Sequence, residues 1–162
     1  MLLRRVSVHR PSGSWPRREA AGTLTLDFDD RHRRRTRLRT DRGEEILLDL
    51  PKAVAMADGD GLQLEDGSWL TVQAAAEPAI EIRHADPVQL ARLAWHLGNR
   101  HLPTEIGKEV LRIRPDHVIE HMLEGLGAKL ARVRSPFQPE GGAYIAQERR
   151  HGHDDRLHVH ER

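Results

Sequence analysis

The spacing of apolar residues changes near residue 77, and this change constrains the fold of the chain more than any other feature. Up to that point apolar and polar residues alternate in short runs such as TLTLDF (23–28), with turn signals such as MADGDG between them. This alternation is typical of half-buried β-strands. Beyond it, Asp86 and Pro87 open a run whose apolar residues recur at helical spacing. The pattern predicts an α+β protein whose residues 1–76 form an all-β domain, a small open sandwich or barrel.

Two helices and four strands are predicted in the second part of the chain. The first helix includes VQLARLAWHL (88–97), and Gly98 is expected to end it in the left-handed conformation. Asp116 is the predicted cap of a second helix, HVIEHMLEGLGA (117–128). The strand candidates around them are PAIEIR, TEIGKEV, VLRIR and KLARVRSPFQPE. The order β-α-β-β-α-β is typical of a ferredoxin-like domain, which we predict for residues 77–147.

Composition limits the compartment and the chemistry. Aromatic residues make up only 4% of the chain, so the core must be aliphatic. The chain has no cysteine, which removes disulfides and thiolate metal ligands. No apolar run approaches the ~20 residues of a membrane span, and the first residues do not resemble a signal peptide. We expect a cytoplasmic protein without a membrane partner.

Charge is nearly balanced along the chain, with one local exception. RHRRRTRLRT (31–40) holds six arginines in its first nine positions. Such a run could bind the phosphates of a nucleic acid. However, Thr36 and Leu38 alternate with arginines at strand spacing, and aspartates flank the run. We interpret it as a solvated strand, expect no nucleic acid among the partners, and keep a nucleic-acid-binding module as the least favoured hypothesis.

Histidines are concentrated in two places. HLGNRHLP presents His101 on a short loop after the first helix, and four of the eleven histidines lie in residues 151–160. Residues 148–162 are polar and charged, so we predict a disordered tail. HGH and HVH in this tail each place two imidazoles two residues apart, a spacing that a flexible chain can fold around one ion. An idle polar tail or an engineered tag are the alternatives, although a tag is normally a homogeneous histidine run.

HVIEH (117–121) also matches the inverted zinc-protease motif HxxEH. His117 and His121 are four residues apart on a predicted helix, so both could approach one metal with Glu120 nearby. The alternative is that they are polar positions on an amphipathic helix. A protease would need a third ligand and a substrate cleft, so we expect no enzyme here.

WHLGNRHLPTEI, the Asp-His-Val segment at Asp116 and the histidine-rich tail together resemble the UreE family of urease accessory proteins, which are nickel metallochaperones. The similarity covers essentially the whole chain. It implies that His101 binds metal at the interface of a homodimer, that His117 is a second metal contact and that His96 is a possible auxiliary one. The chain departs from the pattern at Pro115, where some members have another histidine in a His-Asp-His segment, so it lacks one residue of the side site built on that pair.

The resemblance implies a homodimeric chaperone that delivers Ni(II) to urease by ligand exchange. Delivery would pass through the urease accessory GTPase and the urease apoprotein with its other accessory proteins, with the N-terminal domain as a docking surface. Ni(II) is the expected cargo, and Zn(II) or Cu(II) can bind in its place. The alternative is a metal store or buffer that docks no urease machinery. The expected metal ligands are His101, His117, His151, His153, His158 and His160.

Overall fold

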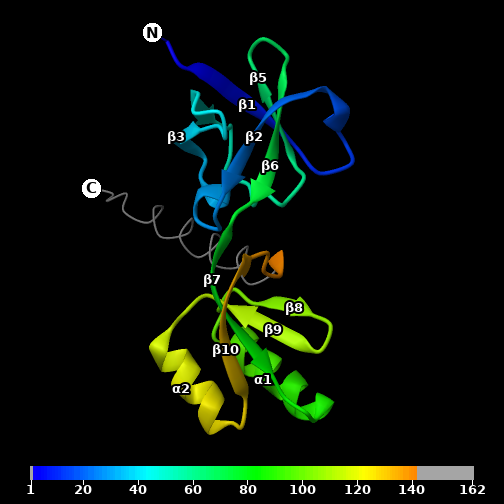
Figure 1. The fold of residues 1–162 in the computed structure, drawn as a ribbon, viewed down its shortest axis with the longest axis vertical. Coiled ribbons are helices and arrows are strands. Elements are labelled where there is room, and N and C mark those ends of the chain that lie inside the picture. The colour runs from blue at the N-terminus through cyan, green and yellow to red at the C-terminus, as the bar shows by residue number, and fades with distance from the viewer. Residues whose placement is uncertain (1, 142–162) are drawn as a thin grey trace, which may run out of the picture. The chain divides into compact units, whose positions relative to one another are not determined.

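The computed structural model describes residues 2–141 and forms two compact units (Figure 1). Within the described residues, the first unit comprises residues 2–77 and 134–138, and the second comprises residues 78–133 and 139–141. The expected mixture of α and β elements, with an N-terminal β domain, is confirmed. The histidine-rich tail lies outside the described residues.

Six strands of the first unit form one mixed sheet in the order β2-β6-β5-β1-β4-β3. β1 pairs with β4, and β2 with β6, in parallel, whereas the other neighbours are antiparallel. β5 and β6 form a hairpin whose turn contains Gly67 at a φ of 86°. The strands are β1 (Arg4–Arg10), β2 (Ala20–Leu26), β3 (Arg35–Arg39), β4 (Glu45–Asp49), β5 (Gly61–Leu64) and β6 (Trp69–Ala74).

This sheet curls around a single aliphatic core. Every strand contributes a buried side chain to one cluster, which requires the inner faces of all six strands to converge. The two edge strands are also tied together. The Asp41 N–H, just after β3, donates to the Thr23 carbonyl of β2 at 2.9 Å, and the Asp41 carboxylate accepts from Thr25. The members of the cluster are Val6, Leu24, Leu26, Leu38, Ile46, Leu48, Leu50, Met56, Leu62, Leu64, Leu70 and Val72.

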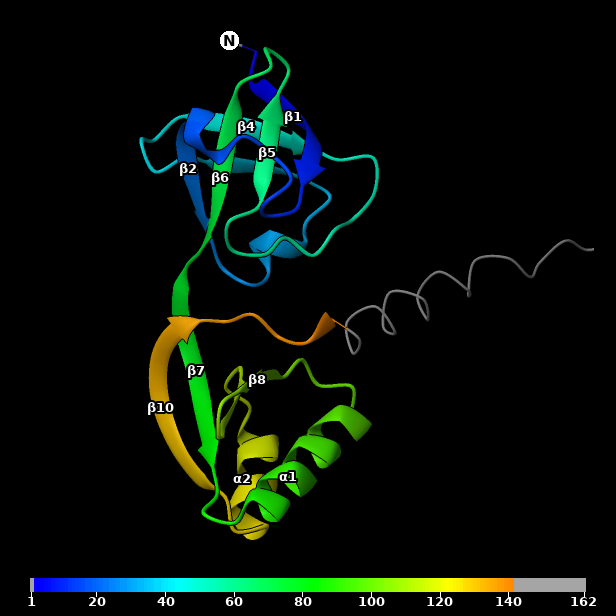
Figure 2. The ribbon, with the colours of Figure 1, turned by 90° about the vertical axis from the view of Figure 1, so that its right-hand side faces the viewer.

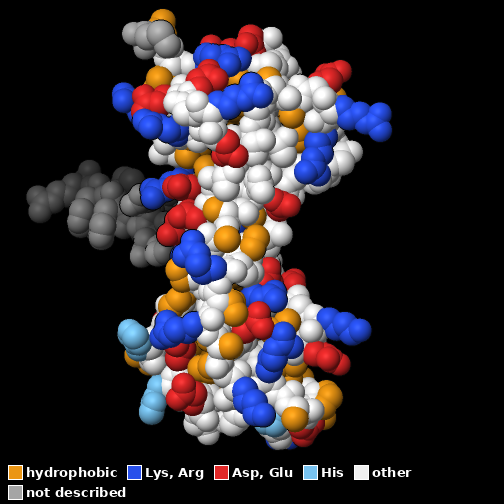
Figure 3. Space-filling model, in the orientation of Figure 1, with side chains coloured by type: hydrophobic (Ala, Val, Ile, Leu, Met, Phe, Trp, Pro, Cys, Tyr) orange, Lys and Arg blue, Asp and Glu red, His pale blue; other side chains and the backbone are white. Residues whose placement is uncertain are grey.

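The arginine run divides into an exposed strand and one buried residue. In β3 the arginines are exposed while Leu38 is buried, as the alternation predicts. Arg31 was expected to be solvated, and this was wrong. It lies in a short 3-10 turn, is only 1% exposed and donates to the backbone carbonyls of Asp27, Met56 and Phe137. Local spacing cannot reveal this, because the carbonyls that satisfy the guanidinium come from distant segments. Figure 3 shows basic and acidic side chains interspersed on the visible face of this unit.

The second unit packs two helices against a four-stranded sheet (Figure 2). The sheet has the strand order β10-β7-β9-β8. Both helices lie on one side of it and bury leucines and isoleucines against Ile80, Ile82, Leu111 and Ile113. The elements in chain order are β7 (Ala76–Arg83), α1 (Pro87–Asn99), β8 (Glu105–Gly107), β9 (Val110–Ile113), α2 (His117–Gly125) and β10 (Lys129–Pro136).

Helix α1 is apolar on two opposite sides. Leu93 and Leu97 are buried in the core of the unit. Val88 and Trp95, seven residues apart and therefore on one side, are 58% and 64% exposed. The sequence indicates this stripe but not that the fold leaves it uncovered in one chain. No helix within residues 2–141 is long and apolar enough to cross a membrane.

Candidate metal centre

A backbone motif at the end of α1 positions His101. The His101 N–H donates to the Gly98 carbonyl at 3.0 Å, and the Leu102 N–H donates to the Leu97 carbonyl at 3.2 Å. These two bonds define a Schellman motif, in which the residue after the helix cap adopts the left-handed conformation. Leu97 is buried and Leu102 packs against the same core cluster. The return of Leu102 to the core therefore fixes where the chain turns.

His101 itself takes the left-handed position, with a φ of 55°. Glycine is the usual residue there, because a Cβ in this conformation costs roughly 1–2 kcal/mol. The prediction that Gly98 would take this position was wrong, since α1 continues through Asn99. The helix ends where the next apolar residue can reach the core, and a glycine does not decide that point. A half-buried histidine in a conformation held by its surroundings is a candidate functional residue.

His117 is the first residue of α2 and is exposed. The Asp116 carboxylate caps the helix by accepting from the Val118 and Ile119 N–H groups at 3.0 and 3.1 Å. His121 follows four residues later and is also exposed. The predicted helix and its cap are confirmed. Both imidazoles face solvent on one side of α2.

Glu120 has a structural role that argues against the protease motif. Its carboxylate accepts from the Asp116 N–H at 3.0 Å and from the Arg132 guanidinium of β10 at 3.2 Å. A general base must instead approach a metal-bound water. Here both carboxylate oxygens hold the start of the helix and its neighbouring strand.

A hollow of about 260 Å³ is lined by the residues that follow His101 and by those that precede His117. Leu102 and Pro103, which follow His101, form one part of its wall, and the residues that precede His117 form the other. Pro115, the position of departure from the family pattern, is on this wall and offers no side-chain ligand atom. The wall comprises Leu102, Pro103, Arg114, Pro115 and Asp116.

The described C-terminal residues also return to the His101 loop. The Glu140 N–H donates to the Thr104 carbonyl at 2.9 Å, three residues beyond His101. Residues 142–162 follow directly in the sequence, so the chain leaves the described part close to this loop. The predicted ligands His151, His153, His158 and His160 lie outside the described residues.

Within residues 2–141 the structure brings no three histidine, aspartate or glutamate side chains together in a way that could hold a metal. His96, the possible auxiliary ligand, is half-buried on α1, and its ring meets the Trp95 ring edge to face at 5.1 Å. Residues 2–141 of one chain therefore offer a metal fewer than three clustered ligands. A multi-ligand site needs further groups from a second copy or from outside these residues.

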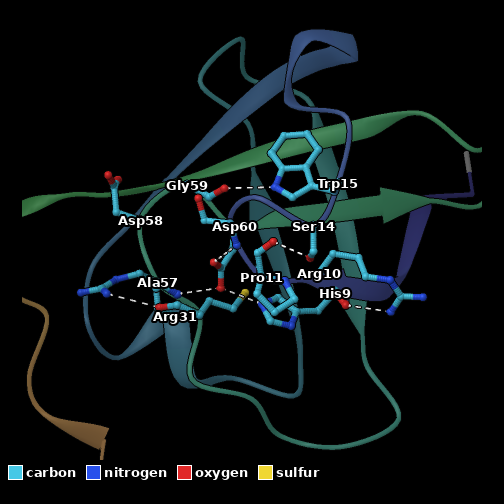
Figure 4. A network of polar contacts seen from close by, with 12 residues as sticks. His9, Arg10, Pro11, Ser14, Trp15, Arg31, Ala57, Asp58, Gly59 and Asp60 are labelled. Carbon is cyan, nitrogen blue, oxygen red and sulfur yellow. Dashed lines mark hydrogen bonds and ion pairs between the residues drawn. The ribbon is translucent and has the colours of Figure 1, made fainter.

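Three other histidines, to which the sequence assigns no role, have local structural partners. His9 Nε2 lies 2.7 Å from Asp60 Oδ2, and both side chains are largely buried (Figure 4). His32 contacts the Phe28 ring at 4.2 Å. His84 Nδ1 accepts from the Asp86 N–H at 2.9 Å. Nothing in the spacing of these histidines distinguishes them from ligand candidates, since their partners are set by the fold.

Comparison with known proteins places the chain in a family. Residues 3–75 match the model for the N-terminal domain of the urease accessory protein UreE, and residues 77–162 match the model for its C-terminal domain. Over 77% of this chain, the sequence is 63% identical to a urease accessory protein UreE of Rhodopseudomonas palustris. Over 82% of this chain, it is 59% identical to a urease accessory protein UreE of a Bradyrhizobium species.

These matches cover 59% and 63% of the two relatives, so the chain spans about three fifths of their length. A UreE of a Chelativorans species is 52% identical over 86% of this chain and 85% of its own length. The two domain models follow one another over nearly the whole sequence. The chain therefore belongs to the UreE family of urease accessory proteins.

Proposed function

We propose that this protein is a nickel-binding metallochaperone that delivers Ni(II) for assembly of the urease active site. The observation that carries the proposal is His101, held in a left-handed conformation where glycine is the less costly residue. Membership of a family named for urease accessory proteins supports the same role. The chain acts in the cytoplasm by ligand exchange, with no covalent chemistry.

The proposed site is shared between two copies of the chain. A two-fold axis brings two copies of one residue together, so two His101 imidazoles could bind one ion. The exposed stripe of Val88 and Trp95 lies on α1, the helix that precedes His101, and it supplies an apolar surface for such a contact. His117 is a second metal contact and His96 a possible auxiliary one. The tail residues His151, His153, His158 and His160 recruit ions and complete the shell.

Imidazole ligands suit the release as well as the binding of the cargo. Ni(II), Cu(II) and Zn(II) all accept neutral imidazole, so Zn(II) or Cu(II) can bind in place of nickel. A site of few, exposed ligands exchanges its ion more readily than a closed cage of four. The urease accessory GTPase and the urease apoprotein with its other accessory proteins are the proposed recipients. The strand order β10-β7-β9-β8 supports a ferredoxin-like arrangement for the unit that carries the site.

The alternative function is a metal store whose capacity lies in the tail. A calorimetric nickel titration of the full chain and of a chain lacking residues 148–162, with molecular mass measured alongside, separates the two. A chaperone keeps one ion per dimer when the tail is removed, whereas a store loses most of its capacity. A tail-deleted dimer that binds no nickel would refute the shared site.

A further inference from the structure

Strand β1 has an open edge in the first unit. Its parallel pairing with β4 covers only Arg4–Val6, whereas its antiparallel pairing with β5 continues to Arg10. A β-bulge lies between Val6 and Val8, at the point where the two pairings part. Among residues 2–141, the strand therefore pairs with β5 alone along Val8–Arg10. In an antiparallel pair, the N–H and C=O groups of every second residue point away from the neighbouring strand. On β1 these groups are therefore available on the open side.

A cavity of about 330 Å³ occupies the space that β4 leaves. The pairing of β4 with β1 ends at Leu48. The Leu50 N–H still donates to the Arg34 carbonyl, which continues the ladder between β4 and β3. The volume falls in the range of natural ligand pockets, which begins near ~300 Å³. We call this cavity the β1 slot. Its walls are Ser7, Val8, His9, Arg10, Leu50, Pro51, Lys52 and Val54.

The floor of the β1 slot is rigid and apolar. Leu50 is 2% exposed, and Val54 packs against the core of the unit. His9 is held by the Asp60 carboxylate, which also accepts from the Ser12 and Ala57 N–H groups at 2.9 Å each (Figure 4). These bonds fix the strand at the slot, so the open edge exists before any ligand arrives.

The rim of the slot carries positive charge. Arg10 of β1 and Lys52, which follows β4, are exposed, and neither side chain forms an ion pair within residues 2–141. In the described part of the chain no acidic residue lines the slot, and two carboxylates that flank its segments in the sequence have other partners: Asp60 binds His9, and Asp49 pairs with Arg5 at 3.0 Å. An incoming carboxylate would therefore meet two cations without a competing anion.

We propose that the β1 slot binds an extended acidic segment of a partner protein by strand addition. The segment would pair with the open edge at Val8–Arg10, place an apolar side chain on Leu50 and Val54, and direct carboxylates to Arg10 and Lys52. An extended peptide fits better than a nucleic acid, because the slot is apolar at its base and offers backbone hydrogen bonds. The inference deepens the proposed function by giving the chaperone a contact for the proteins it serves.

Fluorescence anisotropy with labelled peptides tests this proposal on the full chain. The probes are a five-residue peptide of alternating glutamate and valine, its lysine–valine counterpart, the acidic peptide with N-methylated backbone, and a single-stranded oligonucleotide. The acidic peptide should bind best, and N-methylation should remove binding because it blocks strand pairing. Equal binding of the oligonucleotide, or of the N-methylated peptide, would overturn the proposal.

A matched pair of variants locates the binding site. Lys52→Glu should lower the affinity for the acidic peptide by about fivefold, since it turns one attraction into a repulsion at an exposed site. Arg37→Glu makes the same charge change on the exposed strand β3 and should leave the affinity unchanged. Equal loss in both variants would show general electrostatic attraction and would refute the slot. Amide NMR shifts confined to Val8–Arg10 on titration provide a second readout that does not depend on the variants.

Nickel titration of the same proteins keeps the two proposals apart. Lys52→Glu should bind nickel as the unaltered chain does, and His101→Ala should bind the acidic peptide as the unaltered chain does. A chain that binds the peptide but no nickel would refute the chaperone and leave the slot standing. A chain that binds nickel but no peptide would refute the slot and leave the chaperone proposal standing.

Discussion

The two helices of the second unit end in the same backbone motif with different residues at its critical position. At the end of α2, the Gly127 N–H donates to the Glu124 carbonyl and the Ala128 N–H to the Leu123 carbonyl, both at 3.0 Å. Gly127 takes a φ of 87°. At the end of α1 the equivalent bonds place His101 at a φ of 55°. The end of α2 has glycine at the positive-φ position, which the backbone favours, whereas the end of α1 has histidine there.

This difference separates a structural position from a functional one. Glycine at Gly127 needs no explanation beyond the turn, because it adopts positive φ without steric cost. His101 carries a side chain into the same conformation, which makes it a candidate for a functional role. Under the proposed function that role is metal binding. Four experiments test the comparison, from the largest expected effect to the smallest.

Replacing His101 with Ala should abolish the shared nickel site. The variant keeps a Cβ in the left-handed conformation but has no ligand atom, and a loop residue outside the core contributes little packing. We expect an intact fold, loss of one nickel ion per dimer and impaired urease activation. Calorimetry of the tail-deleted chain and a urease activation assay measure these effects. Normal loading of urease by the variant would show that His101 is not the ligand.

Replacing Gly127 with Ala should destabilise the second unit by about 1–2 kcal/mol. The added Cβ would come no closer than 3.5 Å to His84, so the cost arises from backbone conformation and not from a clash. Urea unfolding followed by circular dichroism gives the free energy. Gly125→Ala, a glycine inside α2 with open space around its Cβ, is the matched control and should stabilise the helix. An unchanged stability in Gly127→Ala would remove the basis of the comparison.

The reverse exchange, His101→Gly, should stabilise the fold while removing nickel. Relief of the left-handed strain favours the variant by roughly 1–2 kcal/mol, and the greater freedom of glycine in the unfolded chain offsets about 0.4–1 kcal/mol of that. A net gain of several tenths of a kcal/mol is expected, together with loss of the shared ion. A variant less stable than the unaltered chain would mean that the imidazole contributes packing that we have not assigned to it.

Acid should lower the stability of the first unit. It should not change the stability difference between the unaltered chain and Gly127→Ala. Burial of the Asp60 carboxyl opposes its ionisation, but hydrogen bonds from His9, Ala57 and Ser12 outweigh burial and hold the pKa of Asp60 below its ordinary 3.8. A carboxyl with a lowered folded-state pKa stabilises the fold above its unfolded-state pKa. That contribution is lost as the pH falls from about 3.8 through the folded-state value.

Urea unfolding at pH 7 and at pH 3 measures this loss. The difference in free energy of unfolding between the unaltered chain and Gly127→Ala should be the same at both values, because neither residue at position 127 is charged. Asp60→Asn is the control, and its stability should depend less on pH than that of the unaltered chain. An unaltered pH dependence in this variant would show that other carboxyls determine the acid transition.

Local patterns predicted the elements of this fold well and their long-range partners poorly. Alternation identified the exposed arginines of β3, and the capping residues Asp86 and Asp116 marked where both helices begin. Those signals act within a few residues. The burial of Arg31 and of Phe137 could not be predicted in this way, because their partners lie in remote segments of the chain.

The candidate site shows the same division. His101 was identified by its residue type and by the family motif, yet its backbone conformation was assigned to Gly98. A glycine near the end of a helix indicates that the chain can adopt positive φ there. The packing of Leu102 against the core determines which residue adopts it. The open edge of β1 had no sequence signal, since strand length alone does not show how far each neighbour pairs with it.

The hydrogen bond between Glu140 and Thr104 has a consequence for how metal binding responds to dilution. His151 follows Glu140 by eleven residues and is therefore tethered within ~40 Å of the anchor, whatever the concentration of protein. A tethered ligand has an effective concentration that dilution does not lower. Two His101 side chains from separate chains have no such protection. Under the proposed function, diluting the protein should therefore weaken the paired site first and leave the part of metal binding that a single chain supplies.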